Sequence, residues 1–423
     1  MASLLNKKLK AGALQYTIFI AVVIALLVFA FISLSFVQNK LRIKATFFQE
    51  VVTASNQSFN RITNIELPYN QKIIVPKDED TYVETTLLKK HWGVYDVLSV
   101  TSTRDNEIFS RTALLGGQEK KRTALYLEDA NQPLVVVGDT RIMGKSYLPI
   151  KGVKRGSIGG KSYMGNQLIY GQVLKSSKKL PEFQNSIKYN EVINRTVLNE
   201  NNETIELDEN LRLVHSFSEP TKIIREYGTI TLNYQKLSGN IVMYSETKIK
   251  VKSISSLKDV ILIAPEIEIE DNVIGNFQAF ANKKITIGKN CVLNYPSALI
   301  LDEKIVQLVN KNEQAPQILI DKESQIKGMV VFISRNETDN YKPQIVIEEQ
   351  STVMGEVYCS KNMELLGMVK GSVYTKGFIA SQFGSVYKNH IYNGKIIAID
   401  LPKQYCGLTF KNSKLEVAQW LNY

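Results

Sequence analysis

An eighteen-residue repeat between residues 239 and 299 restricts the fold more than any other feature of this 423-residue chain. Two apolar series follow this interval, two residues apart, namely Ile249, Ile267 and Ile285, and Val251, Ile269 and Ile287. A spacing of two is typical of a strand with one buried face. The period is too short for a helical hairpin, and β-branched runs separated by Gly, Asn, Asp and Pro are typical of β-helix rungs. The sequence therefore predicts a parallel β-helix.

Further internal matches extend the predicted coil in both directions. IMGKSY at Ile142 returns sixteen residues later as IGGKSY at Ile158, and GEVYCS at Gly355 returns as GSVYTK at Gly371. Residues 317–333 also align with residues 344–360. Rungs are therefore expected from about residue 131 to about residue 399.

The chain begins with a segment suited to a membrane. No charged residue lies between positions 11 and 37, and residues 17–37 are an apolar segment of roughly the ~20 residues that cross a bilayer. A cleaved signal peptide is the alternative, but its apolar part spans only ~7 to 15 residues. Three basic residues precede the segment and three follow it, so charge alone does not set the orientation. A short tail before a large domain favours a single-pass anchor with the C-terminal domain periplasmic or extracellular.

Two further regions connect this anchor to the coil. Residues 38–66 contain neither Gly nor Pro, and the next proline is Pro68. Apolar side chains at Phe48, Val51 and Phe59 recur at helical steps. They predict an amphipathic stalk helix. Residues 80–130 alternate as strands separated by polar turns such as 104–107, which predicts a small antiparallel sheet. We expect this sheet to cover the open end of the β-helix, where unpaired backbone would otherwise be exposed.

The expected fold class is thus mainly β, with an N-terminal helix, a small antiparallel sheet and a solenoid. The predicted divisions are a basic tail 1–16, a transmembrane helix 17–37, a stalk helix 38–66, an antiparallel region 80–130, upper rungs 131–180, an insertion 181–226, a main β-helix 227–400 and a C-terminal cap 401–423.

Composition excludes some classes of function. The net charge is +11, but six uncompensated positive charges lie in the first 44 residues, so the rest of the chain has an excess of only about five. That balance gives no support to a sequence-specific or global nucleic-acid surface. The three cysteines are far apart, so neither a disulfide framework nor a CxxC metal pair is expected.

Catalytic motifs are not found. His91, His215 and His390 have no Cys, Asp or Glu at a recognised ligand or triad spacing, so zinc and histidine catalysis are unsupported and His91 is expected to be a packed sheet residue. Glu266, Glu268 and Glu270 alternate with isoleucines and are expected to form a solvated strand face. The chain is therefore expected to be no enzyme and to need no cofactor. A β-helix lyase or hydrolase acting on polysaccharide is the alternative.

One basic stretch suggests a ligand. Nine basic residues and no acidic one lie between Arg141 and Lys179. The candidate polyanion-binding residues are Lys145, Lys154, Arg155 and Lys161. One repeat separates Lys145 from Lys161, so we expect them to stack on one face and to suit extracellular DNA, acidic polysaccharide or lipid headgroups. A solvated face balanced by carboxylates elsewhere is the alternative.

The N-terminus resembles that of type IV pilin-like proteins, especially minor pilins and pseudopilins. The resemblance rests on the basic leader KKLKAG, the apolar stretch ALQYTIFIAVVIALL and the helical extension after it. In that family a Gly is the processing site and the fifth residue of the mature chain is Glu. If Gly12 is that site, the fifth residue here is Thr17, so processing at Gly12 is left open.

The repeats from about residue 135 to residue 399 resemble those of bactofilin-type bacterial β-helices. Together the two resemblances imply an anchored envelope or surface protein, structural or assembly in role, with lipid contacts through residues 17–37 and pilin-like or envelope assembly partners. The basic stretch between Arg141 and Lys179 adds an acidic polymer as a candidate ligand.

Overall fold

The computed structural model describes residues 12–62, 67–75, 82–184, 188–198, 202–303, 315–336, 341–411 and 413–422. Parts of the predicted tail 1–16 and stalk 38–66 lie outside these ranges. The chain divides into two compact units. The first contains residues 1–60, 73–87 and 100–110, and the second contains the remainder.

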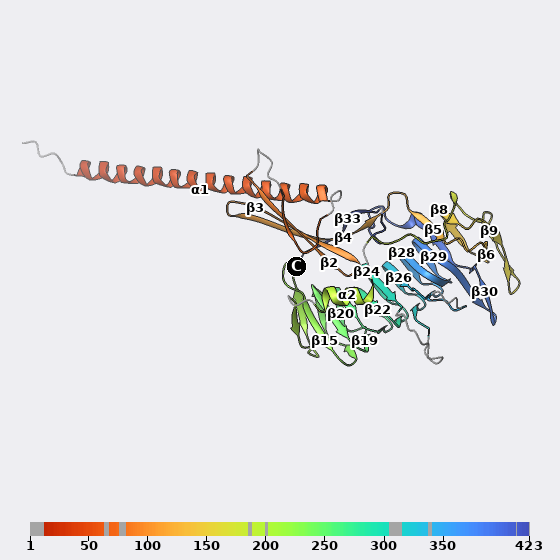
Figure 1. The fold of residues 1–423 in the computed structure, drawn as a ribbon. Coiled ribbons are helices and arrows are strands. Elements are labelled where there is room, and N and C mark those ends of the chain that lie inside the picture. Colours follow the sequence, from red (N-terminus) through yellow and green to blue (C-terminus); the bar gives the residue numbers. More distant parts are fainter. Residues whose placement is uncertain are drawn as a thin grey trace, which may run out of the picture. The chain divides into compact units, whose positions relative to one another are not determined.

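The first unit is dominated by one helix, α1 (Gly12–Ile62), drawn in red in Figure 1. It runs without a break through the predicted membrane segment and through the predicted stalk as far as Ile62, because no Gly or Pro interrupts residues 13–62. Its length and composition suit a membrane crossing, and it is the one helix among the described residues that meets both criteria. The apolar side chains of residues 14–37 are exposed, as expected for a helix that meets lipid rather than a protein core.

The antiparallel sheet has the strand order β1-β2-β3-β4-β33. Its strands are β1 (Lys72–Val75), β2 (Glu84–Trp92), β3 (Tyr95–Arg104), β4 (Glu107–Gln118) and β33 (Lys414–Leu421). The last strand comes from the region predicted as a C-terminal cap, and it pairs antiparallel with β4, with Trp420 opposite Ala113. The C-terminus therefore completes the sheet that follows the helix.

The β-helix consists of parallel ladders. The first contains β14 (Arg212–His215), β17 (Lys236–Gly239), the beginnings of β20 (Ser256–Ile263), β22 (Ile274–Ala281), β24 (Val292–Asp302), β26 (Gln325–Ile333), β28 (Thr352–Leu365) and β29 (Met368–Gln382), then β32 (Lys395–Ile397) and β7 (Arg141–Met143). The second contains β13 (Glu203–Ile205), β15 (Lys222–Glu226), β18 (Ile241–Ser245), the next parts of β20 to β29, then β5 (Thr123–Leu127), β8 (Lys145–Leu148) and β12 (Val173–Lys175).

The third ladder contains β16 (Ile230–Leu232), β19 (Lys248–Val251), β21 (Glu266–Ile269), β23 (Lys284–Ile287), β25 (Gln317–Ile320), β27 (Ile345–Ile347) and the end of β28. A parallel sheet of β31 (His390–Tyr392), β6 (Leu134–Val137) and β9 (Val153–Arg155) accompanies the last rungs. The remaining elements are β10 (Ser157–Ile158), β11 (Lys161–Ser162), β30 (Ser385–Lys388), α2 (Tyr189–Thr196) and the 3-10 turn η1 (Ala398–Asp400).

The eighteen-residue repeat sets the register of the third ladder, as predicted. Ile249 pairs with Ile267, which pairs with Ile285, and all three side chains are buried. Gly355 likewise pairs with Gly371 at the sixteen-residue offset. Both glycines have φ near +150°, and a Cβ at Gly371 would lie 1.8 Å from the carbonyl oxygen of Gly355. A side chain is therefore excluded at this corner of the rung.

The predicted match of Ile142 with Ile158 is wrong as a stacking register. Ile142 pairs with Ile396, whereas Ile158 lies in the β10–β11 hairpin, opposite Lys161. This hairpin leaves the coil and lengthens its rung, so that Ser146 stacks on Val173 instead of on a residue sixteen positions away.

The rungs do not follow chain order. Tyr126 of β5 pairs with Tyr374 of β29, so the rungs between residues 123 and 175 stack on the C-terminal end of the coil. In Figure 1 the yellow strands β8 and β9 lie beside the blue strands β28 and β29. The segment predicted as an insertion, 181–226, contains β13, β14 and β15, which begin the coil. The expected order of upper rungs, insertion and main β-helix is corrected accordingly.

The middle of the second ladder, in β20 to β28, is buried on both faces. Its inward side chains join the central core, while outward residues such as Ile261 and Phe280 form a second apolar cluster with Trp92, Tyr189 and Phe410. The covering elements are therefore α2, the inner part of the antiparallel sheet and the C-terminal segment. The expectation that the sheet covers an open end is corrected, because the apolar surface that needs covering lies along the side of the coil.

This covered face includes a buried carboxyl group. Glu356 is 4% exposed, and its Oε2 accepts a hydrogen bond of 2.6 Å from the backbone N–H of Leu408. Burial raises the pKa of Glu356 to about 8, although the Leu408 N–H acts in the opposite direction. The carboxyl is therefore mostly protonated in the folded chain at neutral pH.

We predict that Ile267→Asn lowers the free energy of unfolding far more than Glu268→Gln. Ile267 is 1% exposed, and an unpaired amide there costs on the order of 1 to 3 kcal/mol in addition to the reduced packing. Glu268 pairs at the surface with Lys248, so its replacement should change little. Urea denaturation of the detergent-solubilised chain measures both variants. Equal destabilisation would contradict the assignment of inward and outward faces.

We also predict a pH dependence that Glu356→Gln removes. Because folding raises the pKa of Glu356, its contribution favours the folded state at low pH and is lost as the pH rises from about 4.5 to about 8. Within this window stability should fall by up to about 1.4 kcal/mol per pH unit. The measurement is urea denaturation at a series of pH values across and just above this window. If the variant keeps the wild-type dependence of stability on pH, that dependence belongs to another titrating group.

Candidate anion-binding site

A column of tyrosines crosses the last rungs of the second ladder. Tyr358 pairs with Tyr374, Tyr374 with Tyr126, and Tyr126 with Tyr147. Their successive ring centroids are 6.5, 6.4 and 5.3 Å apart. Phe410 covers the buried part of the column, with its ring 4.9 Å from that of Tyr374. Tyr126 and Tyr147 are only half-buried, so the column reaches the surface.

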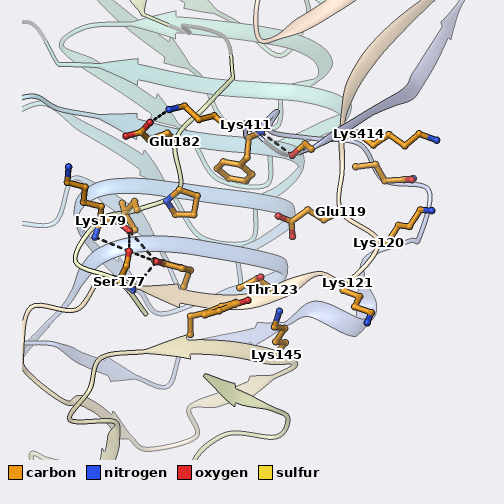
Figure 2. A pocket seen from close by; sticks show the side chains of 17 residues that line it. Glu119, Lys120, Lys121, Thr123, Lys145, Ser177, Lys179, Glu182, Lys411 and Lys414 are labelled. Atoms are coloured by element: carbon orange, nitrogen blue, oxygen red, sulfur yellow. Dashed lines mark hydrogen bonds and ion pairs between the residues drawn. The ribbon is translucent and has the colours of Figure 1, made fainter. Parts of the chain in front are cut away.

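Six lysines surround a hollow of about 730 Å³ at this surface end of the column. They are Lys120, Lys121, Lys145, Lys179, Lys411 and Lys414, which together we call the lysine pocket. In Figure 2, Lys145 and Glu119 lie centrally, Lys120, Lys121 and Lys414 lie along one side, and Lys179 lies on the other. Tyr126, Tyr147 and Phe410 contribute aromatic surface to the same hollow.

The lysine pocket keeps an excess of positive charge. Glu182 pairs with Lys411, and Lys414 Nζ lies 2.9 Å from Glu416 Oε1. Within the part of the chain that the structure describes, Lys120, Lys121, Lys145 and Lys179 form no ion pair. Such a grouping without matching carboxylates attracts anions, and it does so more strongly in a concave surface than on a flat one.

Glu119 is the remaining acidic residue of the pocket. Burial raises the pKa of its carboxyl, opposed by a hydrogen bond from the backbone of Thr123, and the Tyr374 hydroxyl lies 3.5 Å from its Oε2. Glu119 therefore takes up a proton more readily than an exposed glutamate does. When Glu119 is protonated, at mildly acidic pH, it no longer offsets the positive charge of the lysines.

Local backbone structure positions the lysines. Lys120 and Lys121 lie in the turn between β4 and β5, and Lys145 begins β8 opposite Thr123. The Tyr126 hydroxyl donates to the carbonyl of Lys179 at 3.2 Å, and the Ser177 hydroxyl donates to the same carbonyl at 2.7 Å. The tyrosine column thus holds the segment that supplies Lys179.

The structure separates the four predicted polyanion-binding residues. Lys145 lines the lysine pocket, whereas Lys154 and Arg155 lie exposed on β9 and Lys161 lies exposed on β11. The expected stack of Lys145 on Lys161 is wrong, because Lys145 is opposite Thr123 and Lys161 is opposite Ile158. The reason is again the β10–β11 hairpin, which removes residues 157–162 from the ladder.

Sequence reasoning also missed a second polar group. His91 Nδ1 lies 3.2 Å from Asp96 Oδ1, and Lys89 Nζ lies 3.0 Å from Asp96 Oδ2. The two-residue turn between β2 and β3 places positions 91 and 96 opposite each other, so the hairpin pattern contained a signal for this pair. The Tyr69 hydroxyl also donates to Asp96, at 2.9 Å. Both carboxylate oxygens are therefore engaged within the sheet, as expected of a structural network.

No group of His, Cys, Asp and Glu side chains suited to a metal ion occurs among the described residues. The three cysteines are buried, and burial raises the pKa of Cys359 to about 12. Such a thiol is a poor nucleophile. The lysine pocket is consequently the candidate site with the clearest chemistry.

No protein-family model matches the chain, and no curated protein matches it. Among solved structures, the competence-associated pilin ComZ from Thermus thermophilus is similar at 12% identity, and the alignment covers 91% of this chain and 95% of that chain. The TM-score is 0.22, a likeness too slight to carry an argument.

Proposed function

We propose that this chain is a single-pass, membrane-anchored envelope protein, non-enzymatic and structural or assembly in role, whose β-helix domain binds an acidic polymer at the lysine pocket. The observation that carries the polymer-binding part is the group of six lysines around an aromatic-walled hollow. The anchored, pilin-like part is supported by the sequence resemblance of the N-terminus and by the apolar, exposed helix α1.

The lysine pocket suits a polymer with regularly spaced anionic groups. Its lysines come from several separate segments of the chain, so several phosphates or carboxylates can be neutralised at once. Tyr126 and Tyr147 add flat, half-buried surface on which a sugar or a base can pack. Lysine contacts of this kind carry no sequence information, so no base preference is expected.

The alternative, a β-helix enzyme acting on polysaccharide, has less support. Such an enzyme requires clustered carboxylates or an activated basic side chain at its groove. The lysine pocket contains two glutamates, and one of them is already paired with Lys411. A polymer that is bound but not cleaved is therefore the expected outcome.

The anchor predicts a defined topology. A protease added outside the inner membrane should reach residues beyond Lys44 and leave the tail before Lys10 intact, because α1 alone is proposed to cross the bilayer. Replacing Leu26 and Val28 by Arg should release the chain in carbonate extraction, since each central charge costs on the order of 2.5 to 3.5 kcal/mol. Protection of the large domain until the membrane is disrupted would show the opposite orientation.

The polymer site is tested by two quadruple variants that remove the same charge. One changes Lys120, Lys121, Lys145 and Lys179 to Gln, and the control changes Lys151, Lys154, Arg155 and Lys161, which lie outside the pocket, to Gln. Binding of the solubilised full chain to a polyuronate and to DNA is measured between about 50 and 200 mM salt.

We expect the wild type to bind at low salt and to weaken steeply as salt is added. The pocket variant should bind more than tenfold more weakly, and its slope of log K against log salt should be shallower by roughly 0.7 to 0.9 for each anionic group that no longer meets a lysine. The control should retain most of the affinity. If the control binds as weakly as the pocket variant, affinity depends on overall positive charge and not on the lysine pocket. If the wild type does not bind, the polymer-binding function is wrong.

A further inference from the structure

A small recess lies beside α1 where its apolar segment ends. Its volume is about 360 Å³, and it lies entirely within the first unit. One wall is a stripe of the helix that includes Phe36, Lys40, Ile43 and Lys44. The other wall is the β3–β4 turn, residues 105–106, with Glu107 at the start of β4. We call it the membrane-exit recess.

Several contacts fix the turn against the helix. Arg104 forms an ion pair with Glu50, and its guanidinium lies 4.0 Å from the ring centroid of Phe47. Lys44 Nζ lies 3.5 Å from Glu107 Oε1. The rings of Phe48 and Phe109 meet edge to face, with centroids 6.1 Å apart. The recess is therefore held by aromatic and charged contacts on both sides.

The walls change in polarity along the helix. Phe36 and Ile43 supply apolar surface, while Lys40 and Asp105 supply opposite charges. Lys44 and Glu107 already pair with each other, but among the described residues neither Lys40 nor Asp105 forms an ion pair. The recess thus presents one cation and one carboxylate next to an apolar wall. A ligand that satisfies both carries a negative and a positive group close together and an apolar tail.

The depth of the recess matches such a ligand. The apolar segment, residues 17–37, spans about 30 Å as a helix, the thickness of the hydrocarbon core. Phe36 then lies near the hydrocarbon boundary, and Lys40 lies one turn beyond it, about 6 Å farther along the axis. Phosphate and amine groups of phospholipids occupy the layer outside that boundary.

We propose that the membrane-exit recess binds a phospholipid whose zwitterionic headgroup combines a phosphate with a primary ammonium group, as in phosphatidylethanolamine. The phosphate meets Lys40, the ammonium meets Asp105, and an acyl chain packs against Phe36. This inference rests on the membrane anchorage proposed above. A primary ammonium donates hydrogen bonds to a carboxylate, whereas a choline group has no N–H, so the recess should distinguish the two headgroups.

The test uses the full chain, inserted in bilayers with equal amounts of phosphatidylethanolamine, phosphatidylcholine and phosphatidylglycerol. Lipids retained after mild detergent release are counted by native mass spectrometry. The wild type should retain phosphatidylethanolamine several-fold over phosphatidylcholine. Asp105→Asn should abolish that preference, and Asn suits the positive φ of this position. Lys40→Gln should lower retention of all three lipids. Arg42→Gln, an exposed cation that does not line the recess, is the matched control and should behave as wild type.

The outcomes separate this inference from the proposed function. Carbonate extraction of the wild type from the bilayers would overturn both the anchor and the lipid site. An inserted chain that retains the two zwitterionic lipids equally, or whose preference survives Asp105→Asn, overturns only the lipid site. Preferential retention of phosphatidylglycerol also overturns it, because the lysines would then act as simple surface cations.

Discussion

Burial of the middle strands of the second ladder on both faces is the constraint on which the rest of the β-helix depends. A strand exposed on one side alternates apolar and polar residues, but residues 260–264 and 329–333 are apolar without interruption. Their outward side chains need a cover, and α2, the inner strands of the antiparallel sheet and the C-terminal segment provide it. The C-terminal segment is fastened further by Arg122, whose guanidinium donates to the carbonyls of Leu401, Lys403 and Tyr405.

The lysine pocket is a consequence of how this cover ends. Phe410 lies on the ladder over Tyr358 and Tyr374, but the cover does not extend over Tyr126 and Tyr147. The lysines line the hollow at this boundary, beside the half-buried rings of Tyr126 and Tyr147. The same arrangement that stabilises the ladder therefore leaves aromatic surface beside uncompensated positive charge, the combination by which proteins hold single-stranded nucleic acids.

Sequence periodicity predicts the fold class because the stacking of isoleucines at positions 249, 267 and 285 is a local repeat with a physical cause. The same reasoning fails for Ile142 and Ile158. Their surrounding sequences match, but Ile158 lies in a hairpin that interrupts the rung, and so the two residues do not stack. Of the four residues that the sequence proposes as a polyanion site, only Lys145 lines the lysine pocket, and Lys179 ends the same basic stretch. The other lysines of the pocket come from the β4–β5 turn and the C-terminal segment, and pairings such as Tyr126 with Tyr374 have no signal in a single sequence. Where rungs stack out of chain order, spacing cannot reveal which side chains become neighbours.

The placement of β5 on β29 also governs the order in which the molecule can form. Leu125 of β5 pairs with Val373 of β29. A loop containing most of the coil must therefore close before the rungs of residues 123–175 can stack on β29. A chain that emerges from its N-terminus presents those strands long before residues 371–375 appear. β5, β8 and β12 can pair with one another during that interval, but we expect the edge of β5 that later meets β29 to stay open and exposed to other chains. The complete β-helix is therefore a late product of synthesis, and truncation near the C-terminus should disturb the N-terminal rungs first.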